Sequence, residues 1–339
     1  MAKREAAEGV NGRLSIDLDQ DSIAPGEIIC GMVRLGLLES IEAREPLAVV
    51  VQGREAVTWD EERGCSPVTN AFDKIFFQHK IELSPDAVYE AGESEHPFEL
   101  QLPTDLPSSF ELLDIYSETA ERLRVQIKYQ VSVWLRSNRA SVAYLTSEQE
   151  FTVHNPSTSA PPARALEISA SEVVHWLYCV TRGDLQMTVT IPNDVSVAGQ
   201  VVPLQCCVDT SACKAPVKSI SVELVEDVVI QHLGEQPDWT VMRVLSTEQF
   251  AGLEAGCVRK LATNVKFVEN EKQSPVNADV DAHFFQCSHR VIVRCKPRLA
   301  PPIVCEVPVR VQHYKTPFRA GSTRLQRMPA EVMAGHKSP

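Results

Sequence analysis

Apolar and polar residues alternate along most of this chain, which is the pattern of β-strands with one buried and one solvated face. The clearest run covers residues 124–136. Its first face holds Val125, Ile127, Tyr129, Val131, Val133 and Leu135. Its second face holds Arg124, Gln126, Lys128, Gln130, Ser132, Trp134 and Arg136. The run predicts a long strand packed on one side only.

Shorter runs of the same period occur before and after it, at residues 14–18, 75–83, 98–102, 185–191, 220–224 and 305–311. Pro and Gly fall between the runs, where turns require them. We expect about seven strands in each half of the chain, arranged as antiparallel sheets that pack face to face. Only residues 117–123 (SETAERL) suggest a helix, with Ser117 as its N-cap.

The pattern predicts an all-β protein. It would consist of two tandem antiparallel β-sandwiches of immunoglobulin-like architecture, joined by a short hinge. We expect the first sandwich at residues 13–155, a Pro/Ser/Ala linker at 156–165, the second sandwich at 166–314 and an irregular basic tail at 315–339. A weak internal sequence repeat supports two domains of similar structure. The segment from Asp21 resembles the one from Asp194, each a Gly turn followed by a β-branched strand.

The net charge of −12 is opposite to that of most whole-chain nucleic-acid binders. Residues 290–339 nevertheless hold ten Lys and Arg against two acids, so this segment is +8 and the remainder is −20. Four tail cations are candidates for attraction to an anionic leaflet: Arg319, Arg324, Arg327 and Lys337. The alternative is a solvated C-terminus without a partner.

The ten cysteines form no CxxC pair, and the N-terminus lacks the apolar core of a signal peptide. No apolar stretch is long enough to span a membrane. We therefore expect a cytoplasmic protein with reduced, mostly buried thiols. Cys206, Cys207 and Cys213 could respond to redox conditions, but buried structural thiols explain them better.

No sequence feature indicates catalysis, because GxxxxGK, GxGxxG and GxSxG motifs are all missing. His283, Cys287 and His289 share the parity of one strand, and zinc would need a fourth ligand such as Cys295. Half-buried strand residues explain this spacing better. We expect no enzyme activity, no cofactor and no metal.

Binding of a partner protein is the remaining class of function. The polar face of residues 124–136 offers the best surface for it. Arg124, Lys128 and Arg136 lie along one line of that face, extended by Arg139, because strand residues two apart point the same way. An extended acidic tail of a partner could pair with these cations. The alternative is an ordinary solvated face.

Three stretches resemble the arrestin superfamily, in particular the alpha-arrestins or arrestin-domain-containing proteins. The first comprises IAPGEIICGMV at residues 23–33 and LAVVVQGREAVTW at 47–59. The second comprises PFELQLPTDLPSSF at 97–110 and VQIKYQV at 125–131. The third is WLYCVTRGDLQMTVTIP at 176–192, and the resemblance covers about residues 14–314.

The resemblance implies an adaptor that binds cytoplasmic tails of membrane proteins and links them to endocytosis, endosomal sorting or ubiquitylation. It would work in the cytoplasm or peripherally on endosomes or the plasma membrane. The alternative within the same fold is a permanent subunit of an endosomal sorting coat, like retromer's arrestin-fold subunit.

Two departures from the family pattern bear on function. The Pro-Pro pairs at 161–162 and 301–302 are not followed by the Tyr of a Pro-Pro-x-Tyr motif, so recruitment of a ubiquitin ligase by that motif is not expected. The first strand carries Asp17, Asp19 and Asp21 in place of paired lysines. These carboxylates would repel a phosphorylated tail, so activation by phosphate is not expected.

Overall fold

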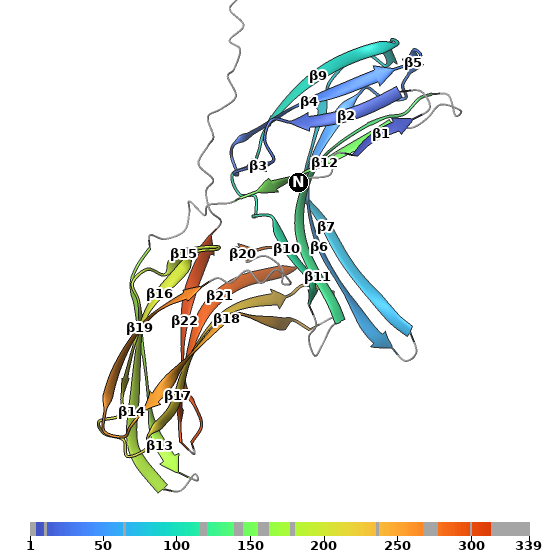
Figure 1. Ribbon diagram of the computed structural model, residues 1–339. Helices are drawn as coiled ribbons and strands as arrows, with labels where there is room; N and C mark the ends of the chain where they lie inside the picture. The colour runs from blue at the N-terminus through green and yellow to red at the C-terminus, as the bar shows by residue number, and fades with distance from the viewer. Residues whose placement is uncertain are drawn as a thin grey trace, which may run out of the picture.

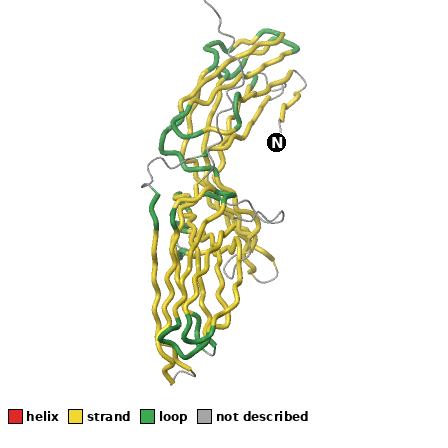
Figure 2. Tube along the Cα trace, turned by 60° about the vertical axis from the view of Figure 1, so that its left-hand side comes forward, coloured by secondary structure: helices red, strands yellow, loops and turns green. Residues whose placement is uncertain are grey.

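The computed structural model describes residues 5–9, 12–63, 66–115, 121–138, 145–154, 163–176, 180–234, 237–266, 277–298 and 300–312. Two all-β lobes follow one another along an elongated molecule, as Figure 1 and the trace in Figure 2 show. The described residues contain no α-helix, and hence none that could cross a membrane. The predicted fold class, two tandem β-sandwiches, is confirmed.

The first lobe contains strands β1 to β12. They are β1 (Glu5–Gly9), β2 (Gly12–Leu18), β3 (Ser22–Ile23), β4 (Ile28–Leu37), β5 (Ile41–Glu42), β6 (Ala48–Arg63), β7 (Ser66–Glu82), β8 (Val88–Tyr89), β9 (Gly92–Gln101), β10 (Phe110–Ile115), β11 (Glu121–Leu135) and β12 (Leu145–Val153). Their hydrogen-bonded order is β7-β6-β11-β12-β1-β2-β4-β9, with β10 on β11 and β3 on β12. β1 pairs with both β12 and β2, so it joins the two layers of this sandwich.

The second lobe contains strands β13 to β22. They are β13 (Leu166–Trp176), β14 (Val180–Ile191), β15 (Val195–Val197), β16 (Val201–Asp209), β17 (Val217–Ile230), β18 (Trp239–Leu253), β19 (Val258–Lys266), β20 (Val280–Asp281), β21 (Phe285–Pro297) and β22 (Ile303–Gln312). One sheet has the order β13-β14-β16-β19 and the other β15-β22-β21-β17-β18, with β20 on β21. Each lobe has more strands than expected, because several are only two or three residues long.

The expected dry faces form the cores. All six apolar residues of the run in β11, from Val125 to Leu135, are at most 2% exposed. The run in β7 is interrupted, however, by a bulge between the pairs Gly53–Phe77 and Arg54–Ile75. The extra residue, Phe76, reverses the alternation. The expectation that Ile75 shares the dry face is therefore wrong: Ile75 is 48% exposed, whereas Phe72 packs on the core.

The weak internal sequence repeat corresponds to a turn that occurs in both lobes. Gly26 has φ +79° and Gly199 has φ +83°, values that favour glycine, and each precedes a long strand. Hydrogen bonds close both turns, from Glu27 N to Ala24 O at 3.1 Å and from Gln200 N to Val197 O at 2.9 Å. The short strands before the turns, β3 and β15, both pair in parallel with the last strand of their lobe. The two lobes therefore contain the same turn motif, each between its second and fourth strands.

The helix expected at residues 117–123 is not formed as predicted. Residues 121–123 are the first residues of β11, and Leu123 is fully buried. Residues 116–120 lie outside the described part of the chain. The burial of Leu123 in the sheet outweighs the local preference of a short helix, which is weak in isolation.

The two lobes share one apolar core at their junction. Figure 1 shows the lower ends of β6, β10 and β11 beside β18, β20 and β21. Aromatic side chains meet across it: ring centroids lie 5.3 Å apart for Trp59 and Trp239 and 4.6 Å apart for Phe110 and Phe285. Because one continuous buried cluster spans both lobes, burial of apolar surface holds them together.

A buried carboxylate completes the junction. Glu55, on β6 of the first lobe, is 1% exposed. Its two oxygens accept hydrogen bonds from the backbone N–H groups of Phe284, at 2.6 Å, and His283, at 3.1 Å, in the second lobe. Burial raises the pKa of Glu55, although the two N–H donors act in the opposite direction. This contact fixes the turn between β20 and β21 against the first lobe.

Candidate interaction surfaces

The cations predicted to bind cargo lie on and beside β11. Arg124 and Lys128 belong to this strand, and Arg136 follows its last residue. Arg139 lies outside the described residues. β11 pairs with β6 along one edge and with β10 and β12 along the other. A peptide therefore has no free backbone edge to join at β11, and contact there must be made by side chains.

Carboxylates are interspersed with these cations. Lys128 Nζ lies 3.5 Å from Glu150 Oε1 and 3.9 Å from Glu111 Oε1. On the adjacent strand, Arg54 pairs with Asp73 at 3.1 Å. These pairs are solvated, and such contacts are worth little individually. The carboxylates of an acidic tail can replace those of Glu150, Glu111 and Asp73 in these pairs. The face is nevertheless of mixed charge rather than strongly basic.

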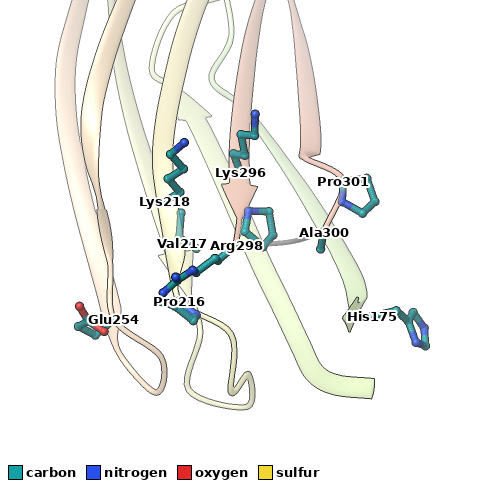
Figure 3. Close-up of a pocket in the computed structure, with 10 residues that line it drawn as sticks. His175, Pro216, Val217, Lys218, Glu254, Lys296, Arg298, Ala300 and Pro301 are labelled. Atoms are coloured by element: carbon teal, nitrogen blue, oxygen red, sulfur yellow. The ribbon is translucent and has the colours of Figure 1, made fainter. Parts of the chain in front are cut away.

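A larger feature lies at the outer end of the second lobe, where Figure 3 shows an open cavity. Its volume is about 1000 Å³, and its lining comes from the ends of β13, β17, β18, β21 and β22. Lys218 and Lys296 project from the neighbouring strands β17 and β21, and Arg298 follows β21. His175 and Glu254 lie on opposite sides of the cavity. We refer to Lys218, Lys296 and Arg298 as the distal cations.

The distal cations differ from other cations of this lobe in their surroundings. Arg290 pairs with Asp227 at 2.8 Å, Arg310 with Asp194 at 2.9 Å, and Arg294 with Glu223. Within the described ranges, no side-chain carboxylate forms an ion pair with any of the distal cations, all of which are exposed. Their positive charge is therefore available to an anion from outside the molecule.

The distal cations could not be recognised from the sequence, because they come from separate strands. Lys218 and Lys296 are distant in sequence, yet Ser219 pairs with Lys296 and brings the two strand ends together. The excess of positive charge after residue 290 was the only signal in the sequence, and it was assigned to the tail. The tail residues Arg319, Arg324, Arg327 and Lys337 lie outside the described residues.

The four residues considered for zinc do not converge. His283 is exposed and its ring stacks on His232 at 5.5 Å, while Cys295 is buried in the core of the second lobe. Cys287 and His289 do lie together, and the third member of their group is Glu226, which was not among the four zinc candidates. The sequence does contain a signal for Glu226: it is a charged residue two positions after Leu224, on the dry face of the same strand.

The two-lobed architecture agrees with comparisons to known protein families. The model of the arrestin (or S-antigen) N-terminal domain matches residues 13–159, and the model of the C-terminal domain matches residues 181–316. This chain belongs to the arrestin superfamily. A search of curated proteins found no match. Arrestin-family proteins are generally adaptors without enzymatic activity that bind partner proteins.

The LPTDLPSSF segment, part of the second stretch that resembles the arrestins, has a structural role here. In LPTDLPSSF, the Pro107 carbonyl accepts a hydrogen bond from Tyr129 Oη at 2.6 Å. Ser109 exchanges two bonds with Val153: its N donates to Val153 O, and its Oγ accepts from Val153 N. These contacts attach the loop before β10 to β11 and β12, so the motif of this arrestin-family chain stabilises the sandwich.

Among the cysteines that the structure describes, most are buried, as expected. Burial raises the pKa of Cys206 to about 12, with a further contribution from Cys207. Its neighbour Cys207 points to the opposite face of β16 and is half-buried. A thiol with so high a pKa stays protonated and is a poor nucleophile, which favours a structural role for Cys206.

Proposed function

We propose that this arrestin-family protein is a cytoplasmic adaptor that binds the tails of membrane proteins while its second lobe contacts an anionic membrane. Bound tails would enter endocytosis, endosomal sorting or ubiquitylation. The observation that carries the proposal is the group of distal cations, Lys218, Lys296 and Arg298, around an open cavity at one end of the molecule. Since no Pro-Pro-x-Tyr motif occurs in the sequence, a ubiquitin ligase would need another contact.

Electrostatics supports an approach to the membrane by the distal end of the second lobe. The chain as a whole carries −12, so an anionic leaflet repels most of its surface. Each cation close to the leaflet contributes about 1 kcal/mol of attraction, and three at one end give a preferred approach. The attraction falls off within a Debye length, about 8 Å at physiological salt, so only the distal end would be held.

Removing the distal cations is expected to weaken membrane binding. Lys218→Gln, Lys296→Gln and Arg298→Gln together should reduce co-sedimentation with vesicles of phosphatidylcholine and phosphatidylserine by about tenfold or more, from roughly 1 kcal/mol per cation. The matched control removes the same charge from exposed lysines elsewhere: Lys80→Gln, Lys260→Gln and Lys266→Gln. Equal losses in the two triple variants would refute a specific distal contact, and so would binding that ignores the phosphatidylserine content.

The polar face of β11 is our proposed cargo surface. Changing Arg124, Lys128 and Arg136 to Ser should reduce capture of an acidic cargo tail about three- to thirtyfold, in line with weak solvated ion pairs. Unfolding should be unchanged within about 0.5 kcal/mol, because surface substitutions rarely exceed that. Capture is measured by fluorescence anisotropy of a labelled tail peptide. Undiminished capture by a correctly folded variant would remove this surface from the proposal.

A permanent subunit of a sorting coat is the second candidate, and the continuous core between the lobes favours it. One buried cluster and the Glu55 contact make a rigid two-lobed body, which suits a fixed position in an assembly. Gel filtration of native lysate separates the two functions. A constant stoichiometric complex supports the coat subunit, and association that depends on cargo supports the adaptor.

A further inference from the structure

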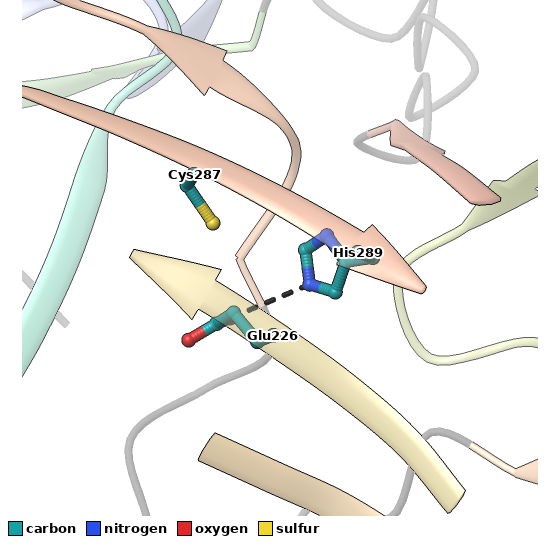
Figure 4. Close-up of side chains that lie close together, drawn as sticks. All are labelled: Glu226, Cys287 and His289. Atoms are coloured by element: carbon teal, nitrogen blue, oxygen red, sulfur yellow. Dashed lines mark ion pairs between the residues drawn. The ribbon is translucent and has the colours of Figure 1, made fainter. Parts of the chain in front are cut away.

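We infer that Glu226, Cys287 and His289 form a binding site for one zinc-class divalent metal ion inside the second lobe. Figure 4 shows the three side chains converging between β17 and β21. One ligand atom from each lies within 4.8 Å of those of the other two. The inference is independent of the proposed adaptor function, because it concerns the interior of the lobe and not its surface.

The register of the sheet creates this group. Glu226 on β17 pairs directly with His289 on β21, and residues paired across neighbouring strands project to the same face. Cys287 is two residues before His289, so it also projects to that face. The exposed fractions are 0% for Glu226, 2% for Cys287 and 3% for His289. Water therefore does not compete for the ligand atoms.

An unsatisfied acceptor points to a missing partner. Glu226 Oε2 lies 2.9 Å from Arg243 Nη2 and 3.4 Å from His289 Nε2. The other oxygen, Oε1, has no hydrogen-bond partner among the described residues, although Glu226 is fully buried. A buried carboxylate oxygen without a donor costs about 1–3 kcal/mol or more. A cation bound at Oε1 would remove that penalty.

His289 is oriented as metal-binding histidines usually are. Its Nδ1 lies 2.7 Å from Asp279 Oδ1, which leaves Nε2 directed toward the other members of the group. A carboxylate behind a metal-bound imidazole fixes the ring and raises its basicity. Asp279 is thus a positioning residue and not a ligand.

The charges around the site fit a divalent ion. Arg243 and the carboxylates of Glu226 and Asp279 together carry −1. A divalent ion with the Cys287 thiolate adds +1, because metal binding releases the thiol proton. With a neutral His289 the metal-bound group is therefore neutral, so it places no net charge in the apolar interior.

The ligand types select the metal. Thiolate, imidazole and carboxylate together suit Zn²⁺, whereas Mg²⁺ and Ca²⁺ prefer oxygen ligands only. Three protein ligands leave one position for another donor. Bound metal would connect β17 to β21 close to the lobe junction, because Cys287 belongs to the buried cluster that the lobes share.

Cobalt substitution tests the site, because Co²⁺ takes the place of Zn²⁺ and absorbs visibly. The full chain is produced in medium supplemented with cobalt and desalted before its metal content and absorption are measured. We expect one Co²⁺ per chain, with a thiolate-to-cobalt charge-transfer band in the near ultraviolet. Metal content in Cys287→Ser and Glu226→Gln should be at least about tenfold lower.

Cys295→Ser is the matched control, since Cys295 is another fully buried thiol on β21 but lies outside the group. It should retain both the metal and the charge-transfer band. Circular dichroism confirms that each variant is folded. Wild-type protein without bound cobalt, or a charge-transfer band that survives Cys287→Ser, would overturn the inference.

Discussion

Glu55→Ala is expected to lower the free energy of unfolding by about 2–5 kcal/mol, because it leaves one buried and one part-buried N–H group without an acceptor. Those groups, on His283 and Phe284, have the Glu55 oxygens as their partners across the lobe junction. Loosened packing at the junction should also separate the unfolding of the two lobes. Denaturant titration followed by tryptophan fluorescence reports on it, because Trp59 and Trp239 lie in contact there.

The matched control is Glu55→Gln, which keeps the shape and one acceptor oxygen. We expect a loss of about 1–2 kcal/mol, since only one of the two N–H groups then lacks an acceptor. Losses below about 0.5 kcal/mol for Glu55→Ala would show that the carboxylate does not hold the lobes together.

The titration of Glu55 is also expected to make the free energy of unfolding depend on pH. Burial raises its pKa in the folded state above the ordinary value of 4.5, so the unfolded chain releases this proton at lower pH than the folded chain. The stability contributed by this titration is therefore full below pH 4.5 and declines as the pH rises through the folded pKa. The difference in stability between wild type and Glu55→Gln isolates the effect. A difference that grows with rising pH would contradict the assignment.

Arg243→Met is expected to lower the free energy of unfolding by about 3–5 kcal/mol, because it strands a buried carboxylate. Arg243 and Glu226 are 8% and 0% exposed, and their pair spans 2.9 Å between β18 and β17. Burial alone would raise the pKa of Glu226, but the hydrogen bond from His289 and the charge of Arg243 outweigh it and lower the pKa. Chemical denaturation of metal-free protein measures the loss.

Two further variants separate the buried pair from general effects of losing an arginine. Adding Glu226→Gln to Arg243→Met should recover most of the stability, because a neutral pair is not penalised by burial. Arg294→Met removes a cation from the wet face of the same sheet, where its side chain is 33% exposed, and should cost less than about 1 kcal/mol. Equal losses of stability for Arg243→Met and Arg294→Met would show that an unpaired buried carboxylate is not the cause.

The fold was largely predictable because its main signal is local. A strand packed on one side must alternate apolar and polar residues, and the six apolar positions of β11 did so without interruption. Alternation failed where the backbone geometry changed. The bulge at Phe76 in β7 depends on pairing with β6, which no local pattern records. The helix prediction was wrong at residues 121–123, because the burial of Leu123 places them in β11.

The candidate sites were less predictable, because each is assembled from separate strands. The sequence placed Arg124, Lys128 and Arg136 on one line, since their spacing along a single strand suffices for that. It could not bring Lys218 to Lys296, which depends on the register between β17 and β21.

The sequence by itself determined the period of the strands, the division into two lobes and most of the residues that face each core. The structure shows that Glu55 and Glu226 also lie at dry positions of β6 and β17, where a carboxylate is unexpected. Only the tertiary structure decided what those carboxylates contact, namely the backbone of the other lobe for Glu55, and Arg243 with His289 for Glu226. The physical reason is that burial follows from local alternation, whereas the partner of a buried charge is set by the packing of distant strands.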